Sequence, residues 1–149
     1  MVVNGWRLFQ HPLFEAQVRE LAEFVEKLSA KSPETYREHS KTKLFATIRR
    51  YIAEIIPLDP CAPEFRLGDA LGPDNRHWFR AKFHRRFRLF FRFSSRERII
   101  VYVWVNDELT LRKEGSKTDP YLVFRSMLRA GDPPQDLKSL LLRCRELER

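Results

Sequence analysis

The chain has 149 residues, enough to bury a sizeable core, and a formal net charge of +8 favours polyanionic partners such as nucleic acid. Its two cysteines are too few for a disulfide framework, and no apolar run approaches the length of a membrane span. Composition therefore argues against a disulfide-stapled secreted protein and against a membrane partner. We expect a cytoplasmic protein with one domain over residues 1–149.

The first part of the chain predicts a strand followed by two helices. Residues 2–10 alternate as a short strand, and a helix begins at Pro12 because proline fits the first helical turn. The apolar side chains of this helix recur at spacings of four and three; they are Phe14, Val18, Leu21, Val25 and Leu28. A second helix is predicted over residues 32–57, with Ser32 as its N-cap. The two helices form a hairpin that can cover one face of a sheet.

The middle of the chain predicts three antiparallel strands. In residues 79–83 and 87–93 apolar side chains alternate with basic ones, so each strand has an apolar face and a basic face. Residues 99–105 are almost wholly apolar and predict a third strand, buried on at least part of both faces. If neighbouring strands pair in register, the basic side chains share one sheet face, with Tyr102 and Trp104 as candidate neighbours. A positive face with aromatic residues suits RNA.

The remaining segments complete an α+β domain. Residues 64–68 are compatible with a short strand, and residues 108–118 read as a loop after the meander. Asp119 caps a third helix that ends near Gly131, and leucines mark a final amphipathic helix over residues 137–147. We expect a mostly antiparallel twisted sheet of about four or five strands, with the helical hairpin on one face and one or two C-terminal helices.

Short motifs spread over nearly the whole chain carry a family resemblance. They are Asn4-Gly5-Trp6, His11-Pro12, Thr42-Lys43-Leu44, Trp78 to Phe83, Arg88 to Arg92, Trp104 to Glu108, Thr110-Leu111-Arg112, and Lys117-Thr118-Asp119 with Tyr121 and Phe124. The chain resembles the YhaV-type toxins of bacterial type II toxin–antitoxin systems, within the RelE-like group of RNA-cleaving toxins. The resemblance implies a RelE-like fold and an endoribonuclease, without metal or cofactor, that cuts mRNA and inhibits translation and growth. It also implies a hetero-oligomer with a neutralising antitoxin of the PrlF type.

Metal-free cleavage of RNA requires a base for the 2′-hydroxyl, neutralisation of the phosphorane charge, and protonation of the leaving 5′-oxygen. Matched by position, the resemblance implies four catalytic residues: Arg80, Lys82, Arg88 and Arg112. Arginine binds phosphate through paired hydrogen bonds but does not lose its proton, so Lys82 is the candidate base. We assign Arg80 and Arg88 to the phosphate, and Arg112 to orientation or to leaving-group charge. Residues 106–108 could bind an ion, orient Arg112, or form a polar turn with a salt bridge.

Six further residues are candidate RNA contacts: His84, Arg85, Arg86, Arg92, Trp104 and Tyr121. His84 could act as an acid or base, although a lone histidine in a basic loop is more often a surface residue. Trp104 could stack on a base or pack in the core. Tyr121 is a candidate for the aromatic residue of the family's C-terminal site, but a helix start suits packing equally well. Arg86 and Phe87 stand where the family often has glycine and tyrosine, so a tyrosine hydroxyl is missing there.

The alternative to an enzyme is a non-catalytic RNA- or ribosome-binding module that blocks translation by occupancy. Binding would depend strongly on salt in both cases, because phosphate contacts release counterions. Only the enzyme leaves cut RNA, so the basic face by itself does not separate the two hypotheses.

Overall fold

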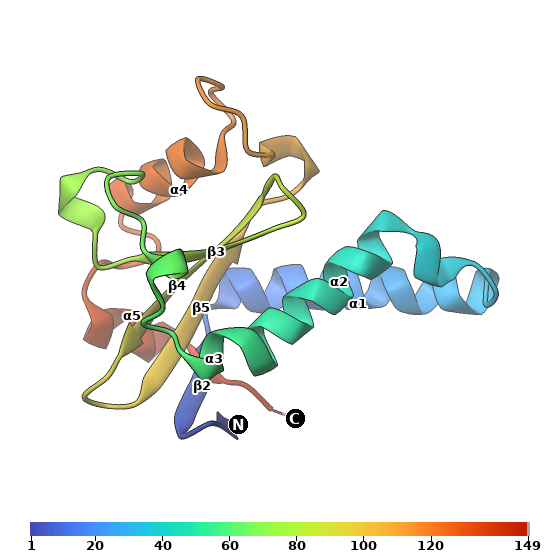
Figure 1. The fold of residues 1–149 in the computed structure, drawn as a ribbon, viewed down its shortest axis with the longest axis horizontal. Helices are drawn as coiled ribbons and strands as arrows, with labels where there is room; N and C mark the ends of the chain where they lie inside the picture. Colours follow the sequence, from blue (N-terminus) through green and yellow to red (C-terminus); the bar gives the residue numbers. More distant parts are fainter. Residues whose placement is uncertain (149) are drawn as a thin grey trace.

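The computed structural model describes residues 1–148 as a six-stranded mixed sheet with helices on both faces (Figure 1). The strands are β1 (Val2–Val3), β2 (Trp6–Gln10), β3 (Phe79–Phe83), β4 (Phe87–Ser94), β5 (Ile99–Val105) and β6 (Arg145–Glu146). The α-helices are α1 (Pro12–Lys31), α2 (Ser40–Arg50), α3 (Ile56–Leu58), α4 (Pro120–Arg129) and α5 (Leu137–Arg143). Shorter segments are the 3-10 turns η1 (Tyr36–Glu38), η3 (Pro63–Phe65), η4 (Pro73–Asn75) and η5 (Glu108–Thr110), and the π-helical η2 (Tyr51–Ile55). The predicted α+β class is confirmed.

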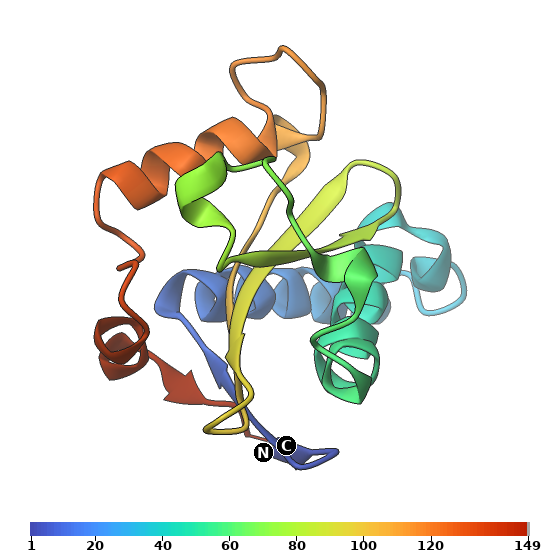
Figure 2. The ribbon, with the colours of Figure 1, turned by 60° about the vertical axis from the view of Figure 1, so that its left-hand side comes forward.

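The strand order is β1-β2-β5-β4-β3, and β6 pairs with β2. Strands β3, β4 and β5 form the predicted antiparallel meander, whereas β2 runs parallel to β5. Helices α1 and α2 form a hairpin against one face, and α4 and α5 lie on the other side of the sheet (Figure 2). The basic sheet face is therefore partly covered. None of the helices in residues 1–148 has both the length and the apolar character needed to cross a membrane.

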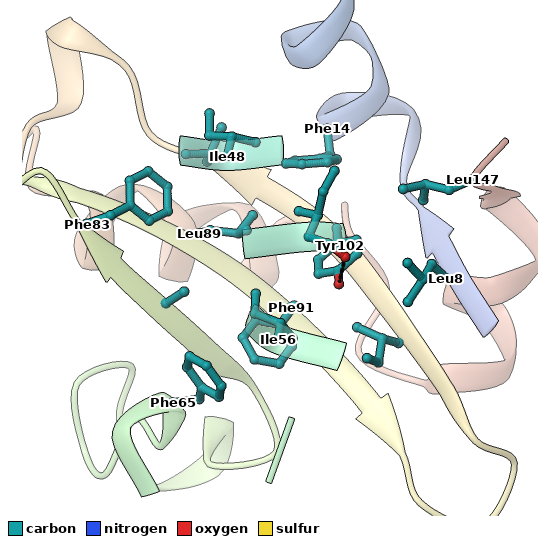
Figure 3. Packing of buried hydrophobic residues seen from close by; sticks show 14 of the residues in the cluster. Leu8, Phe14, Ile48, Ile56, Phe65, Phe83, Leu89, Phe91, Tyr102 and Leu147 are labelled. Atoms are coloured by element: carbon teal, nitrogen blue, oxygen red, sulfur yellow. Dashed lines mark hydrogen bonds between the residues drawn. The ribbon is translucent and has the colours of Figure 1, made fainter. Parts of the chain in front are cut away.

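Two apolar cores hold the helices to the sheet. The core under the helical hairpin contains Phe14 of α1, Ile48 of α2 and Leu89 of β4, all with at most 1% of their surface exposed (Figure 3). The second core lies under α4, where the Phe90 and Phe124 rings stack with centroids 4.4 Å apart. Every residue of β5 is buried, because this strand has a core on each face, as its apolar sequence predicted.

Simple alternation places Tyr102 and Trp104 of β5 on one face of the sheet, but a β-bulge puts them on opposite faces. The register between β4 and β5 shifts between Phe90 and Phe91, so that Phe90 pairs with Trp104 and Phe91 with Tyr102. Tyr102 consequently packs in the hairpin core, while Trp104 stacks on Phe124 in the second core. Only 9% of Trp104 is exposed, and its ring is not available to stack on an RNA base. For Trp104 the structure therefore favours packing in the core over stacking on a base.

The start of the second helix differs from the prediction. Ser32 is the C-cap of α1, with its N–H bonded to the carbonyl of Leu28 at 2.8 Å, and α2 begins only at Ser40. The N-cap of α2 is His39, whose Nδ1 accepts a hydrogen bond from the N–H of Lys41. The helix also continues one residue beyond Pro57, the predicted stop. A proline lacks an N–H, and the π-helical segment η2 changes the hydrogen-bond pattern just before it.

Three other predicted boundaries are corrected by the structure. Residues 2–10 form two strands rather than one, because Asn4 and Gly5 adopt positive φ values of 50° and 80° and turn the chain. Residues 64–68 contain the turn η3 and a single bridge to β3 instead of a strand. The helix predicted over residues 137–147 ends early, because the following residues pair with β2 as β6.

His11 is a buried N-cap of α1. Its Nδ1 accepts a hydrogen bond from the N–H of Leu13 at 3.1 Å, and only 3% of the residue is exposed. Its Nε2 lies 3.6 Å from Oδ1 of Asp132. Burial lowers the pKa of His11 below its ordinary value, because the charged imidazolium is poorly solvated there.

This lowered pKa predicts a loss of stability in mild acid. Between the ordinary histidine pKa of about 6.5 and the lower folded value, the unfolded chain binds the extra proton, so the free energy of unfolding decreases as pH falls. His11→Asn retains a side-chain oxygen that can cap the helix but does not titrate. Urea titrations from pH 7.5 to 5 are expected to show a smaller pH dependence for the variant than for the wild type. If the free energy of unfolding depends on pH equally in both proteins, His11 is not the group responsible.

Candidate active site

Four of the residues predicted from the sequence meet where α4 crosses the sheet. They form the arginine–tyrosine cluster: Arg80, Arg88, Arg112 and Tyr121. The Tyr121 hydroxyl accepts a hydrogen bond from Nε of Arg80 at 2.8 Å and another from Nε of Arg88 at 3.1 Å. The guanidinium carbon of Arg112 lies 5.1 Å from the centre of the Tyr121 ring. Three positive charges thus surround one phenol.

Strand register explains why the two strand arginines are neighbours. Arg80 of β3 pairs with Phe90 of β4, and Lys82 pairs with Arg88. Side chains two residues apart on a strand share a face, so Arg80, Lys82 and Arg88 all emerge on the α4 side of the sheet. The sequence prediction that these three basic residues share a face is confirmed.

Asp119 positions both the tyrosine and the third arginine. Its Oδ2 accepts a hydrogen bond from the N–H of Tyr121 at 3.1 Å, as expected of a helix N-cap. Its Oδ1 accepts one from Nη1 of Arg112 at 2.6 Å and one from the N–H of Lys113 at 2.8 Å. The sequence analysis found only the capping role. The overlooked signal is that a cap occupies one carboxylate oxygen and leaves the other for a nearby cation.

Within residues 1–148, no hydrogen bond or ion pair joins residues 106–108 to the Arg112 side chain. Asp107 and Thr110 form a capping box around η5, which is the predicted polar turn with hydrogen bonds in place of a salt bridge. Asn106 is buried, and its side chain accepts a hydrogen bond from the N–H of Arg88 at 2.6 Å and donates one to the carbonyl of Thr110. Asn106 therefore ties the start of β4 to the segment that carries Arg112.

Both strand arginines are almost buried yet keep free donors. Arg80 is 9% exposed and Arg88 is 8% exposed. Nη1 of Arg80 donates to the carbonyl of Arg66, and Nη1 of Arg88 donates to the carbonyls of Phe87 and Arg85. Within residues 1–148, Nη2 of each arginine has no hydrogen-bond partner, and neither atom is sealed from solvent. These N–H groups are available to an anion such as phosphate.

The remaining basic residues of this region lie around the cluster or away from it. The Lys82 side chain is exposed, and Arg85 and Arg86 lie in the exposed turn between β3 and β4. Nε of Arg86 donates to the carbonyl of Arg112, which supports the Arg112 segment. Arg92 lies farther along β4, where Nη1 donates to the carbonyl of Gln135 at 2.6 Å and burial lowers the pKa of the guanidinium. Arg92 is therefore held against the segment before α5, apart from the cluster.

Strand alternation predicted that His84 shares the face of the cluster. The structure contradicts this prediction. Its Nε2 lies 2.8 Å from Oγ1 of Thr47 on α2, and its ring contacts the rings of Phe83 and Phe87. His84 and Arg85 have positive φ values of 46° and 62°, so the chain leaves the extended conformation and alternation fails at this turn. The structure thus turns His84 toward the helical hairpin.

The fold and the cluster together indicate a protein that acts on phosphodiesters. A basic α+β domain presents arginine N–H groups and a tyrosine hydroxyl on a sheet face, with Arg112 and Asp119 at its border. Such a set of donors suits a phosphodiester, since the charge that develops during phosphoryl transfer is negative.

Comparisons with known proteins identify the family. One family model matches residues 8–145. It is named for the toxin YhaV and describes toxins with endonuclease activity that belong to toxin–antitoxin systems. The chain belongs to this family, and the resemblance inferred from its motifs is confirmed. It is 47% identical over 140 residues to Toxin YhaV of Escherichia coli O6:H1, covering 93% of this chain and 91% of that protein. It is 46% identical, with the same coverage, to Ribonuclease toxin YhaV of Escherichia coli K12. No solved structure matches the chain.

Family membership establishes the general function. The protein is the toxin of a bacterial toxin–antitoxin system and has endonuclease activity. Such a system includes an antitoxin, so the protein has an antitoxin partner. The hypothesis of a non-catalytic module is not favoured.

Proposed function

We propose that the protein is an endoribonuclease that cleaves mRNA through the 2′-hydroxyl, without a metal ion, and thereby inhibits translation and growth. The observation that carries this proposal is the convergence of Arg80 and Arg88 on the Tyr121 hydroxyl, with an Nη2 of each arginine free. The name of the E. coli K12 relative, a ribonuclease toxin, supports RNA as the substrate. Residues 1–149 would act as one RelE-like domain in the cytoplasm, alone on mRNA or on the ribosome.

The arginines supply the electrostatic part of the reaction. Nη2 of Arg80 and of Arg88 would bind the scissile phosphate and stabilise the additional negative charge of the phosphorane. Arg112, which is oriented by Asp119 through a 2.6 Å contact, would hold an adjacent phosphate or the leaving group. This use of three fixed guanidinium groups is why the reaction needs no metal ion in our proposal.

The proton transfers involve the lysine and the tyrosine. A hydroxyl has two acceptor positions and one proton, and both acceptor positions of Tyr121 are directed at arginine N–H groups. Its proton is therefore free to be donated, and we assign Tyr121 to protonation of the leaving 5′-oxygen. Lys82 would accept the proton of the 2′-hydroxyl. The 2′-oxygen bonds to phosphorus as the bond to the 5′-oxygen breaks, leaving a 2′,3′-cyclic phosphate and a 5′-hydroxyl.

The antitoxin is proposed to be of the PrlF type, and the toxin to be held inactive as a hetero-oligomer with it. The positive charge of the chain, +8, is consistent with an RNA-binding protein. His84, Arg85, Arg86 and Arg92 remain candidate contacts to RNA outside the cleaved bond. Arg86 contacts the cluster through its side chain, and Arg85 through its carbonyl.

A cleavage assay with chelator tests the proposal. Purified toxin, free of antitoxin, is incubated with labelled mRNA in excess EDTA, with and without translating ribosomes. We expect new 5′-hydroxyl ends, and no cutting of a matched RNA with 2′-deoxy nucleotides at the cleaved positions. Dependence on magnesium or cutting of the 2′-deoxy substrate would contradict the mechanism, and intact RNA despite tight binding would favour the occupancy hypothesis.

A further inference from the structure

The helical hairpin leaves part of its apolar stripe without a partner. Helices α1 and α2 extend beyond the sheet (Figure 1). Of the five apolar residues that the sequence placed on one face of α1, only Phe14 is buried. Val18 and Leu21, farther along the helix, are half-buried. A 20-residue α-helix is about 30 Å long, so it reaches past the width of the strands that it covers.

A groove follows this uncovered stripe, and we call it the hairpin groove. It has a volume of about 340 Å³ between α1, α2 and the end of β5. Its apolar lining includes Val18, Leu21, Leu44 and Phe87, while Leu109 at its rim is 82% exposed. A contiguous apolar lining that is open to solvent is typical of an interaction site.

The charges around the hairpin groove argue against RNA as its occupant. Glu20, Asp107 and Glu108 line it, and Lys41 is the one basic residue of its lining. The chain as a whole carries a charge of +8, so this is an acidic site on a basic protein. A polyanion would be repelled here, whereas a protein segment with aliphatic and basic side chains would be attracted.

The hairpin groove also leads toward the arginine–tyrosine cluster. A smaller hollow of about 160 Å³ shares Leu44, Phe87 and Glu108 with the groove and reaches Leu111. Leu111 directly precedes Arg112, whose guanidinium covers the Tyr121 ring. A segment seated in the groove would therefore reach the chain segment that carries Arg112, although the cluster itself lies on the opposite, α4 side of the sheet.

We propose that the hairpin groove receives an amphipathic helix of the antitoxin, with aliphatic side chains against Leu21, Leu44 and Leu109 and basic side chains facing Glu20, Asp107 and Glu108. Helices commonly bind grooves in this way, through anchors spaced by three or four residues. The occupant follows from the family, which requires a protein partner, and from the complementary charge. By contacting the segment that carries Arg112, the bound helix would inhibit the enzyme. Binding of the helix in the groove does not depend on the proposed RNA cleavage. Only the inhibitory consequence rests on the proposed function.

Binding measurements with matched exposed leucines test the proposal. Leu109→Glu places a charge at the groove rim, and Leu142→Glu, on α5, places the same charge at a residue that is 81% exposed but outside the groove. Purified PrlF-type antitoxin is titrated into each variant by calorimetry. We expect Leu109→Glu to weaken binding about 10–100-fold and Leu142→Glu to leave it within about twofold. Glu20→Lys, on exposed α1 surface, is expected to weaken binding as well.

The remaining outcomes separate this proposal from the proposed function. RNA cleavage by the free Leu109→Glu variant is expected at the wild-type rate, because Leu109 is outside the arginine–tyrosine cluster. Wild-type antitoxin affinity in both Leu109→Glu and Glu20→Lys would overturn the groove proposal while leaving the nuclease proposal intact. A loss of RNA affinity in Leu109→Glu, or a wild-type dimer that this variant converts to monomers, would overturn it in favour of RNA or of a second copy.

Discussion

Replacement of Arg88 by alanine is expected to lower the rate of RNA cleavage by about 10²–10³-fold, the usual effect of removing one donor that stabilises transition-state charge. Arg88 is the more buried of the two strand arginines, and its Nε hydrogen bond holds the Tyr121 hydroxyl. The loss should appear mainly in kcat, because Arg80 and Arg112 still bind the substrate. Arg88→Lys should restore little, since a lysine cannot donate to the tyrosine and to phosphate in the same fork geometry.

The control for Arg88 is Arg96→Ala, which removes an exposed arginine in the turn after β4. This variant should cut RNA at nearly the wild-type rate. Thermal unfolding of Arg88→Ala and Arg88→Lys separates a catalytic loss from unfolding. A folded Arg88→Ala protein with wild-type kcat would remove Arg88 from the proposed mechanism.

Tyr121→Phe is expected to lower kcat by about 10²-fold or more, the effect of losing a positioned proton donor. The phenylalanine ring retains the edge-to-face contact with Phe90 at 5.7 Å, so the second core should stay intact. The substitution leaves Nε of Arg80 and of Arg88 without their acceptor, so each side chain is held only by the bonds of its Nη1 to backbone carbonyls. RNA affinity should change much less than kcat, because all three guanidinium groups remain.

Tyr36→Phe provides the matched control, because Tyr36 lies in η1 at a distance in the fold from the cluster. Single-turnover cleavage and binding are measured separately for both variants. If Tyr121→Phe cuts at the wild-type rate, the hydroxyl has no part in proton transfer. If it instead loses RNA affinity with unchanged kcat, Tyr121 acts in binding alone.

The sequence could predict local structure wherever one short-range pattern dominated. The capping signal at Asp119 and the inward spacing of Tyr121, Phe124 and Leu128 predicted α4 with correct limits near both ends. The second helix was predicted too early because Ser32-Pro33 looks like a helix start, whereas the tertiary structure uses Ser32 to end α1 and a histidine to begin α2. A capping residue is ambiguous in this way because the same side chain can follow one helix or precede another.

In the candidate site, too, local patterns placed some residues correctly and failed for others. Alternation along β3 and β4 was sufficient to place Arg80, Lys82 and Arg88 on one face, because side-chain direction in a strand depends only on the backbone. Alternation failed for His84, at a turn with positive φ, and for Tyr102, which a bulge places on the face opposite to Trp104. Both failures arise where the backbone departs from a regular strand.

The sequence by itself determined the family, the basic strand face and the helix that carries Tyr121, since each depends on residue identity and short-range spacing. Only the tertiary structure decided that α4 crosses this face and brings the Tyr121 hydroxyl between Arg80 and Arg88. It also decided that Asp119 holds Arg112 and that a groove stays open between the helical hairpin and the end of β5. These features depend on how helices pack across the sheet, and packing between distant segments is set by the shapes of two whole cores.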